Sequence, residues 1–235
     1  MFMYSIVIPT KNEEVYLPKL LASIRTQTLA PDAIIVADAK STDRTRDLVN
    51  DFGGKIVDGG LPGVGRNIGA SYVQSKWIVF LDADAVLPAE NTIQAAIAEA
   101  EANGYDLCTG FVEPPVDRFI DRLWYGAYNW YIRHAWFLLP HTAGYCLIVR
   151  REAHERIHGF DISVVFCEDH DYGMRMSRVG TVQYLPTLRV PVSERRLKKD
   201  GYVGTAVRFF LAEVHLLFLG PIRHHLFRYT FGYIN

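Results

Sequence analysis

The sequence has few cysteines, and they lack the spacing that a disulfide framework or a zinc site requires. Among 235 residues there are three, Cys108, Cys146 and Cys167, far apart and without a CxxC pair. This usage is typical of a reducing compartment and excludes a disulfide-stabilised scaffold. The apolar residues 5–9 are too few for a signal peptide and have no basic flank. We therefore expect a cytoplasmic protein.

The chain also lacks a net charge of either sign. It has 25 Lys and Arg against 26 Asp and Glu, so no overall positive charge points to nucleic acid as a partner. The distribution is uneven, because residues 189–235 hold eight basic and three acidic residues, a local charge of +5. With 49% hydrophobic and 22% charged residues, the composition is that of a globular protein. The basic C-terminal segment therefore needs an explanation of its own.

The C-terminal segment has no uninterrupted apolar run of the length that a membrane-spanning helix needs. Residues 201–218 follow a helical apolar pattern, but Arg208, Glu213 and His215 interrupt it, and residues 223–229 mix basic and aromatic side chains. Such a mixture suits a helix in a membrane interface, on the inner face of the membrane for a cytoplasmic protein. A C-terminal helix packed on the domain explains the pattern equally well, so both interpretations stay open.

The remaining chain alternates short apolar runs with helical patterns, and it has no internal repeat or convincing linker. This alternation predicts an α/β fold with a mostly parallel central sheet flanked by helices. We expect a domain over residues 1–200 and a helical extension over 201–235. Residues 121–140 are unusually aromatic, which fits a core helix or a second membrane contact. Strands are expected at residues 4–8, 33–37, 55–57, 77–81, 107–112, 144–149 and 181–185.

Two aspartates follow the most apolar of these runs. Residues 77–81 read as a buried strand that ends at Asp82-Ala83-Asp84. In extended backbone the side chains of Asp82 and Asp84 share a face, and paired carboxylates suit Mg²⁺ or Mn²⁺. Taken alone, the pattern describes a solvated strand end equally well. A metal site therefore needs further residues from neighbouring loops, which the parallel sheet would bring to the same edge at residues 9–13 and 38–45.

Five segments in order resemble the family 2 glycosyltransferases, which are inverting enzymes of the GT-A fold that use nucleotide-sugars. Each match is weak alone, but their order and spacing are those of the family. The segments are Ile-Pro-Thr-Lys-Asn-Glu-Glu at 8–14, Asp-Ala-Lys-Ser-Thr-Asp-Arg-Thr at 38–45, Arg-Asn-Ile-Gly at 66–69, Phe-Leu-Asp-Ala-Asp at 80–84 and Glu-Asp-His-Asp at 168–171.

The resemblance implies a nucleotide-diphospho-sugar donor, a Mn²⁺ or Mg²⁺ cofactor and a saccharide or lipid-linked acceptor, with single-sugar transfer as the reaction. It implies that Asp84 ligates the metal and that Asp169 is the general base for the acceptor hydroxyl. Without the upstream motifs, Glu168 and Asp169 would read as acids that merely favour a helix N-terminus. The implied donor-binding residues are Pro9, Thr10, Glu13, Asp38, Arg66 and Asp82.

The sequence departs from the family pattern in two places. Ala39 and Lys40 replace the usual Asp-Gly, which puts the geometry of that turn in doubt. No Gln-x-x-Arg-Trp motif follows Asp169, which speaks against a processive synthase. Arg195 and Arg196 are further donor-binding candidates, because the guanidinium fork matches phosphate oxygens, although a solvated basic face explains them equally well.

The sequence disfavours three other functions. A nicotinamide enzyme is disfavoured, because the glycine-rich loop expected at residues 59–69 has GxGxxxG spacing and follows the third strand rather than the first. A nucleotidyltransferase would also pair acids around a metal, but residues 9–13 are not the basic, glycine-rich loop that it would need. A catalytically inactive nucleotide-sugar-binding module is the third alternative, which the intact Asp84 and Asp169 disfavour.

Overall fold

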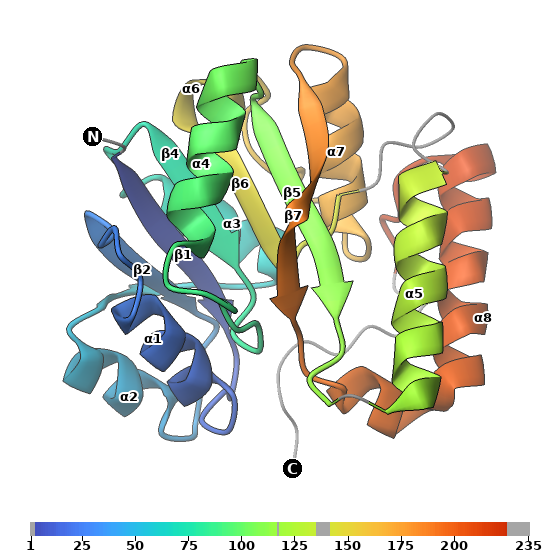
Figure 1. Ribbon diagram of the computed structural model, residues 1–235, viewed down its shortest axis with the longest axis horizontal. Coiled ribbons are helices and arrows are strands. Elements are labelled where there is room, and N and C mark those ends of the chain that lie inside the picture. Colours follow the sequence, from blue (N-terminus) through green and yellow to red (C-terminus); the bar gives the residue numbers. More distant parts are fainter. Residues whose placement is uncertain (1–2, 117, 135–141, 225–235) are drawn as a thin grey trace.

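The computed structural model describes residues 3–116, 118–134 and 142–224, and it is built on one seven-stranded sheet (Figure 1). The strand order is β3-β2-β1-β4-β6-β5-β7. The strands are β1 (Tyr4–Thr10), β2 (Ala33–Asp38), β3 (Lys55–Asp58), β4 (Trp77–Leu81), β5 (Leu107–Glu113), β6 (Cys146–Arg150) and β7 (Val182–Pro191). All seven expected strands are present, and the predicted α/β class is confirmed.

One strand makes the sheet mixed. β6 is antiparallel to both of its neighbours, β4 and β5, whereas the other four pairings are parallel. Because β6 runs in the opposite direction, its first residues lie at the edge where the parallel strands end. The loop before β6 therefore reaches the same rim as the loops after β1 and β4.

Helices cover both faces of the sheet (Figure 1). Ile6 and Ile8 of β1 pack in one core with residues of α1 and α4, while Val7 packs in the opposite core with residues of α3 and α7. This alternation is the period of two that a strand buried on both faces must have. The helices are α1 (Leu17–Arg25), α2 (Thr45–Phe52), α3 (Pro62–Ala70), α4 (Thr92–Asn103), α5 (Phe119–His134), α6 (Arg151–Arg156), α7 (Glu168–Ser177) and α8 (Arg195–Leu219).

Helix α8 begins earlier than the sequence pattern indicated. It starts at Arg195 rather than at residue 201, with one non-helical residue, Gly201, inside it. Arg195 and Arg196 therefore lie in the first turn of a helix and not in a loop. α5 confirms a helix over most of the aromatic segment, whereas the predictions for residues 135–140 and for the basic tail after residue 224 lie outside the described residues.

The glycine-rich stretch at 59–69 was expected to be a loop, but most of it is helix α3. Its glycines allow the helix to lie close to the sheet. A Cβ atom on Gly69 would come within 2.3 Å of Cγ1 of Val7, which is fully buried in β1. Close packing, and not turn formation, explains this glycine.

We expect Gly69→Ala to lower the free energy of unfolding by about 1–3 kcal/mol, because the new methyl group must displace Val7 or the helix. Urea unfolding followed by circular dichroism measures the change. Gly126→Ala is the matched control, since nothing lies within 4 Å of a Cβ at that position in helix α5. The control should be neutral or stabilising, by about 0.5–1 kcal/mol. Equal stability of Gly69→Ala and the wild type would contradict the close approach.

Candidate functional site

A cavity of about 220 Å³ opens at the rim where β1 and β4 end. The first turns of α7 and α8 close two of its sides, and the inward face of α5 contributes Trp124, Tyr125 and Tyr128. Eight of the ten predicted site residues line it, from segments up to 187 positions apart in the sequence. They are Pro9, Glu13, Arg66, Asp82, Asp84, Asp169, Arg195 and Arg196.

Arg66 is the buried centre of this site. Its side chain is 2% exposed, and its guanidinium donates to Oδ1 of Asp82 and to Oε1 of Glu168, both at 2.7 Å. It also donates to the carbonyl oxygen of Gly144 at 3.2 Å. The glycine-rich helix α3 holds Arg66 beneath the cavity, so this one residue joins the end of β4 to the start of α7.

Burial changes the acidity of the first aspartate of the motif. Desolvation raises the pKa of Asp82 to about 6, while the charge of Arg66 opposes this shift. Arg66 occupies Oδ1 of Asp82, and no described residue donates a hydrogen bond to Oδ2. One carboxylate oxygen of Asp82 is therefore bound to Arg66, and the other is available to a ligand in the cavity.

Asp84 is held in a similar way from the other side. Its Oδ2 accepts a hydrogen bond of 2.5 Å from the Ser193 hydroxyl and lies 3.1 Å from Nε of Arg195. Among the described residues, none donates a hydrogen bond to Oδ1 of Asp84. The two aspartates thus present one carboxylate oxygen each to the cavity, as the Asp-x-Asp pattern suggested.

Arg195 also pairs with Glu13, 182 residues earlier in the chain. One of its amino groups lies 2.7 Å from both carboxylate oxygens of Glu13, whose side chain is 1% exposed. Desolvation raises the pKa of Glu13 to about 7 against the opposing effect of Arg195. The first turn of α8 is therefore fastened to the loop after β1 and to the aspartate motif together.

Thr10 and Asp38 do not line this cavity. Both are buried, and Asp38 accepts hydrogen bonds from the Thr10 hydroxyl at 3.2 Å and from the Ser41 hydroxyl at 2.5 Å. Arg46 adds an ion pair of 3.0 Å to the same carboxylate. Lys40 has a φ of 58°, the left-handed conformation that glycine adopts most readily. The turn that the unusual Ala39-Lys40 put in doubt is therefore formed with a lysine in place of glycine.

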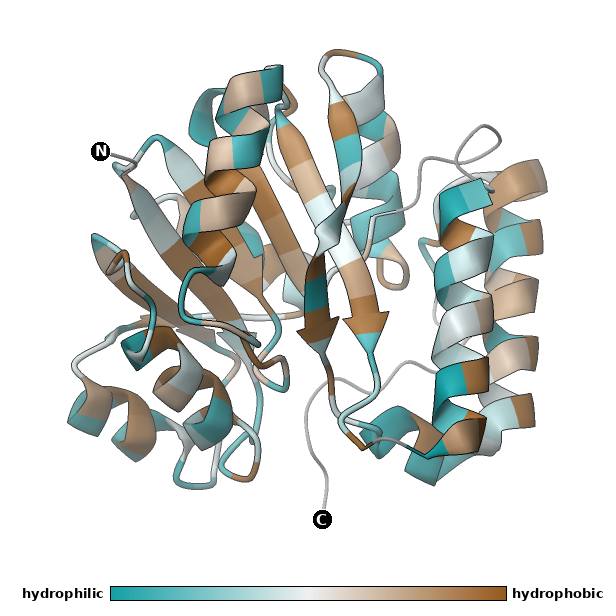
Figure 2. Cartoon of the chain, in the orientation of Figure 1, coloured by the Kyte–Doolittle hydropathy of each residue, from teal (hydrophilic) through white to brown (hydrophobic). Residues whose placement is uncertain are grey.

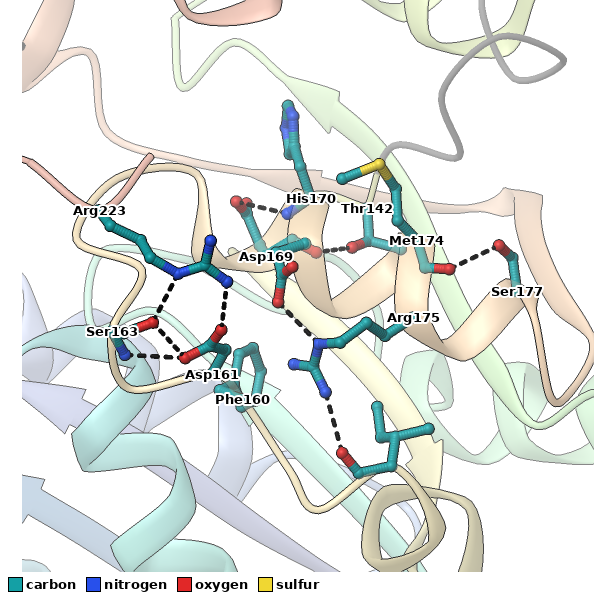
Figure 3. A network of polar contacts seen from close by, with 12 residues as sticks. Thr142, Phe160, Asp161, Ser163, Asp169, His170, Met174, Arg175, Ser177 and Arg223 are labelled. Carbon is teal, nitrogen blue, oxygen red and sulfur yellow. Dashed lines mark hydrogen bonds and ion pairs between the residues drawn. The ribbon is translucent and has the colours of Figure 1, made fainter. Parts of the chain in front are cut away.

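Asp169 lies in the first turn of α7 and is oriented by backbone groups (Figure 3). Its Oδ2 accepts from the Gly144 N–H at 2.7 Å, and its Oδ1 accepts from the His170 N–H at 3.0 Å. The Thr142 hydroxyl donates to the Asp169 carbonyl oxygen. Gly144 thus contacts both Asp169 and Arg66, a role that nothing in the sequence signalled.

Glu168 and the aromatic side chains of α5 were likewise not predicted as site residues. Glu168 stood in the quoted motif, but its partner Arg66 lies 102 residues away. Trp124, Tyr125 and Tyr128 were assigned only to a core helix or a membrane contact. Their alignment on one face of α5 was the available signal, since positions i and i+4 of a helix lie together.

The donor set can be tested for its fit to a divalent cation. Five carboxylates (Glu13, Asp82, Asp84, Glu168 and Asp169) face three arginines in the cavity lining, which leaves an excess of two negative charges when all are ionised. No group of three or more His, Cys, Asp or Glu residues suited to a metal occurs in the described part of the chain. A cation held through the free oxygens of Asp82 and Asp84 would take its other ligands from water and a phosphate group, as Mg²⁺ commonly does.

Comparison with known families agrees with this geometry. The model of the family described as Glycosyl transferase family 2 matches residues 5–157, more than half of the chain. The chain belongs to this family. It is therefore a member of a glycosyltransferase family, and the nucleotidyltransferase and nicotinamide alternatives are set aside.

Curated relatives within the family are moderately similar. The chain is 35% identical over 102 residues to the 4,4'-diaponeurosporenoate glycosyltransferase of Staphylococcus haemolyticus. It is 33% identical over 139 residues to a PGL/p-HBAD biosynthesis glycosyltransferase of Mycobacterium bovis. These matches cover 40% and 54% of this chain but 27% and 52% of the two relatives, so the chain spans only part of their length.

Solved structures show the same GT-A fold. The mannosyltransferase PcManGT from Pyrobaculum calidifontis, in complex with GDP-Man and Mn²⁺, has a TM-score of 0.68 at 20% identity, covering 91% of this chain and 69% of its own. S. aureus TarS 1-349 in complex with UDP-GlcNAc has a TM-score of 0.65 at 18% identity, covering 91% and 67%. The predicted GT-A fold is confirmed, whereas the roles of individual site residues remain predictions.

Replacing Arg66 by methionine should strand the carboxylates of Asp82 and Glu168 without their buried partner. We expect Arg66→Met to lose about 3–5 kcal/mol of unfolding free energy, measured by urea denaturation. Lys76→Met is the control, because the Lys76–Glu101 pair is exposed and should contribute no more than about 1 kcal/mol. If both variants lost the same small amount, Arg66 would not be the buried centre of the site.

Glu13 should give the metal-free protein a stability that falls as pH rises. Its pKa is about 7 in the folded protein against an ordinary value of 4.5, so between these values the folded chain holds a proton that the unfolded chain releases. We expect Glu13→Gln to flatten the decline in unfolding free energy between about pH 5 and about pH 8 by up to about 3 kcal/mol. Urea unfolding across this range measures it, with the exposed Glu90→Gln as control. Parallel pH profiles for wild type and Glu13→Gln would contradict the raised pKa.

Proposed function

We propose that this glycosyltransferase moves one sugar from a nucleotide-diphospho-sugar to an acceptor hydroxyl with inversion at the anomeric carbon. The observation that carries the proposal is that Asp169, Asp82 and Asp84 line one cavity while Arg66 fastens their two elements together. An oriented base and a cation-binding pair in one cleft are what in-line displacement at an anomeric centre needs.

In the proposed reaction, Asp169 accepts the proton of the acceptor hydroxyl. The acceptor oxygen forms a bond to the anomeric carbon as the bond from that carbon to the diphosphate oxygen breaks, and the nucleoside diphosphate leaves. The Gly144 and His170 N–H groups hold the Asp169 carboxylate in place for this step. Asp169 would have to lie within about 3 Å of the hydroxyl.

Asp84, supported by Asp82, would hold Mn²⁺ or Mg²⁺, which when bound neutralises negative charge on the departing diphosphate. Two neighbours in the fold carry Mn²⁺ with nucleotide ligands, PcManGT and a glucosyl-3-phosphoglycerate synthase from Mycobacterium tuberculosis, which supports this cofactor class. Arg195 and Arg196 line the cavity beside these acids. Their guanidinium groups suit the phosphate oxygens of the donor.

The acceptor side of the cavity is aromatic. Its aromatic lining comes from two helices: Trp124, Tyr125 and Tyr128 of α5, and Phe209 of α8. Aromatic faces suit a sugar ring or an apolar chain, and we propose a saccharide acceptor carried on a lipid. Names of the relatives support glycosyl transfer to varied acceptors, since one is named for 4,4'-diaponeurosporenoate and another for poly(ribitol-phosphate).

Donor binding is tested by calorimetry with UDP-, GDP- and dTDP-sugars, each in Mn²⁺ and in excess chelator. We expect one nucleotide class to bind only with the metal. Asp84→Asn should abolish the metal-dependent part of the affinity, because it removes a charged ligand. Absence of metal-dependent binding for every nucleotide would count against the proposed donor and cofactor.

Catalysis is tested by following labelled sugar from the bound donor into lipid extracted from the host's membranes. Asp169→Asn should retain donor affinity and lose about 10²–10⁴-fold in transfer rate, because it removes the base. Asp171→Asn is the matched control: it lies in the same turn of α7 but pairs with Arg175 and does not line the cavity. Near-normal transfer by Asp169→Asn would exclude it as the base, and donor binding without transfer by the wild type would indicate an inactive module.

A further inference from the structure

Helix α8 exposes apolar side chains to solvent, whereas a helix on the surface of a globular domain normally exposes polar ones. Between residues 203 and 219 its exposed side chains are all apolar, with Val203, Phe210 and Phe218 between 67% and 77% exposed. Amphipathic surface helices normally turn such a stripe toward the core. The whole outward stripe consists of Val203, Val207, Phe210, Leu211, Val214, Leu217, Phe218 and Leu219.

A polar contact on the opposite side of α8 fixes the rotation of the helix. Glu213 lies 3.5 Å from Nδ1 of His170 in α7. Ala212 and Leu216 pack beside it against Phe166 and Cys167. Turning the apolar stripe inward would break these contacts, so the outward stripe is a property of the folded domain.

Helix α5 extends the same apolar surface. It lies beside α8 along one edge of the molecule, and the two helices run in the same direction (Figure 1). Tyr202 of α8 joins the two helices through a hydrogen bond of 2.5 Å to Asp121 and an edge contact with Trp124. Phe119, Leu123 and Trp130 of α5 are 59% to 74% exposed. Figure 2 shows the resulting hydrophobic bands along the outer side of α8.

The charges around this surface have one sign. In residues 118–134 and 194–224, every charged side chain that is exposed is basic, and the four acids are turned inward and paired. The exposed charges are Arg118, Arg122, Arg133, Arg196, Lys198, Lys199 and Arg223. An apolar stripe bordered by basic groups complements an anionic lipid surface. A second copy of this chain would instead bring like charges together.

We infer that the outward face of α5 and α8 lies on an anionic lipid bilayer. By length and composition α8 is the one helix in the described residues that could cross a membrane. Its inward face is committed to the domain through Glu213, Ala212 and Leu216, so it lies along the interface with Phe210 and Phe218 among the acyl chains. The exposed Trp130 suits the boundary between headgroups and hydrocarbon.

If the proposed function holds, the docked orientation also places the acceptor side of the cavity near the bilayer. Inward-facing residues of the same two helices, Trp124, Tyr128 and Phe209, line the catalytic cavity. Docking therefore holds the acceptor side of the cavity next to the bilayer, where the hydroxyl of a lipid-linked saccharide can reach Asp169. Lipid binding itself needs neither donor nor catalysis, so the two proposals fail independently.

The test is flotation of the full chain, without donor or metal, with vesicles of phosphatidylcholine alone or mixed equally with phosphatidylglycerol. The wild type should bind the anionic vesicles and release them at high salt. Phe210→Ser with Phe218→Ser should weaken binding at least about tenfold, since two large apolar side chains leave the acyl region. Tyr72→Ser with Val179→Ser is the matched control on exposed apolar residues elsewhere, and it should bind as the wild type does.

A second set of variants tests how much the basic residues contribute to vesicle binding. Lys199→Glu with Arg133→Glu should remove most of the preference for anionic vesicles, about tenfold, whereas Lys19→Glu with Arg178→Glu should leave it unchanged. Thermal melting by circular dichroism and nucleotide affinity verify that each variant is folded. Failure of the wild type to bind anionic vesicles would overturn the proposal, as would equal binding by the two serine pairs. A dimer that Phe210→Ser with Phe218→Ser dissociates, in a protein that binds no vesicles, would assign the face to a second copy.

Discussion

A single buried charge organises this enzyme. The Arg66 guanidinium has almost no access to water, and a buried charge is tolerated only where opposite charges and hydrogen-bond acceptors surround it. Asp82 and Glu168 provide the charges, and the Gly144 carbonyl provides a further acceptor. Because these groups come from the end of β4, the start of α7 and the loop before β6, satisfying Arg66 brings the elements that carry Asp82, Asp84 and Asp169 to one place.

The sequence was sufficient to predict the sheet and the rim at which the site lies. Apolar runs of strand length ended in polar loops, and parallel strands bring such loops to one edge. Long-range pairs could not be predicted in the same way. Nothing local to Arg195 indicates that Glu13 is its partner, and nothing in the segment around Asp38 indicates that Thr10 binds its buried carboxylate.

The spacing of apolar residues along the chain predicts helices and strands, but it does not predict how they are oriented in the fold. The apolar run that forms β6 predicts a strand but not the direction of that strand, so its antiparallel orientation could not be predicted from the sequence. In α8 the spacing of apolar residues predicted a helix with an apolar face, but not which face meets the protein. That choice is made by tertiary partners of its polar residues, such as His170 for Glu213. Gly69 was assigned to a loop because its role, contact with Val7, is visible only after folding.

The reversed direction of β6 has a bearing on how such enzymes diversify. The chain leaves the sheet at the end of β5 and re-enters it at the start of β6, and both points lie at the same rim. Helix α5, which carries the aromatic lining of the cavity, therefore lies on a segment whose length and sequence can change without altering strand register. The variable part must stop short of Gly144 at the end of this segment, because Gly144 contacts both Arg66 and Asp169.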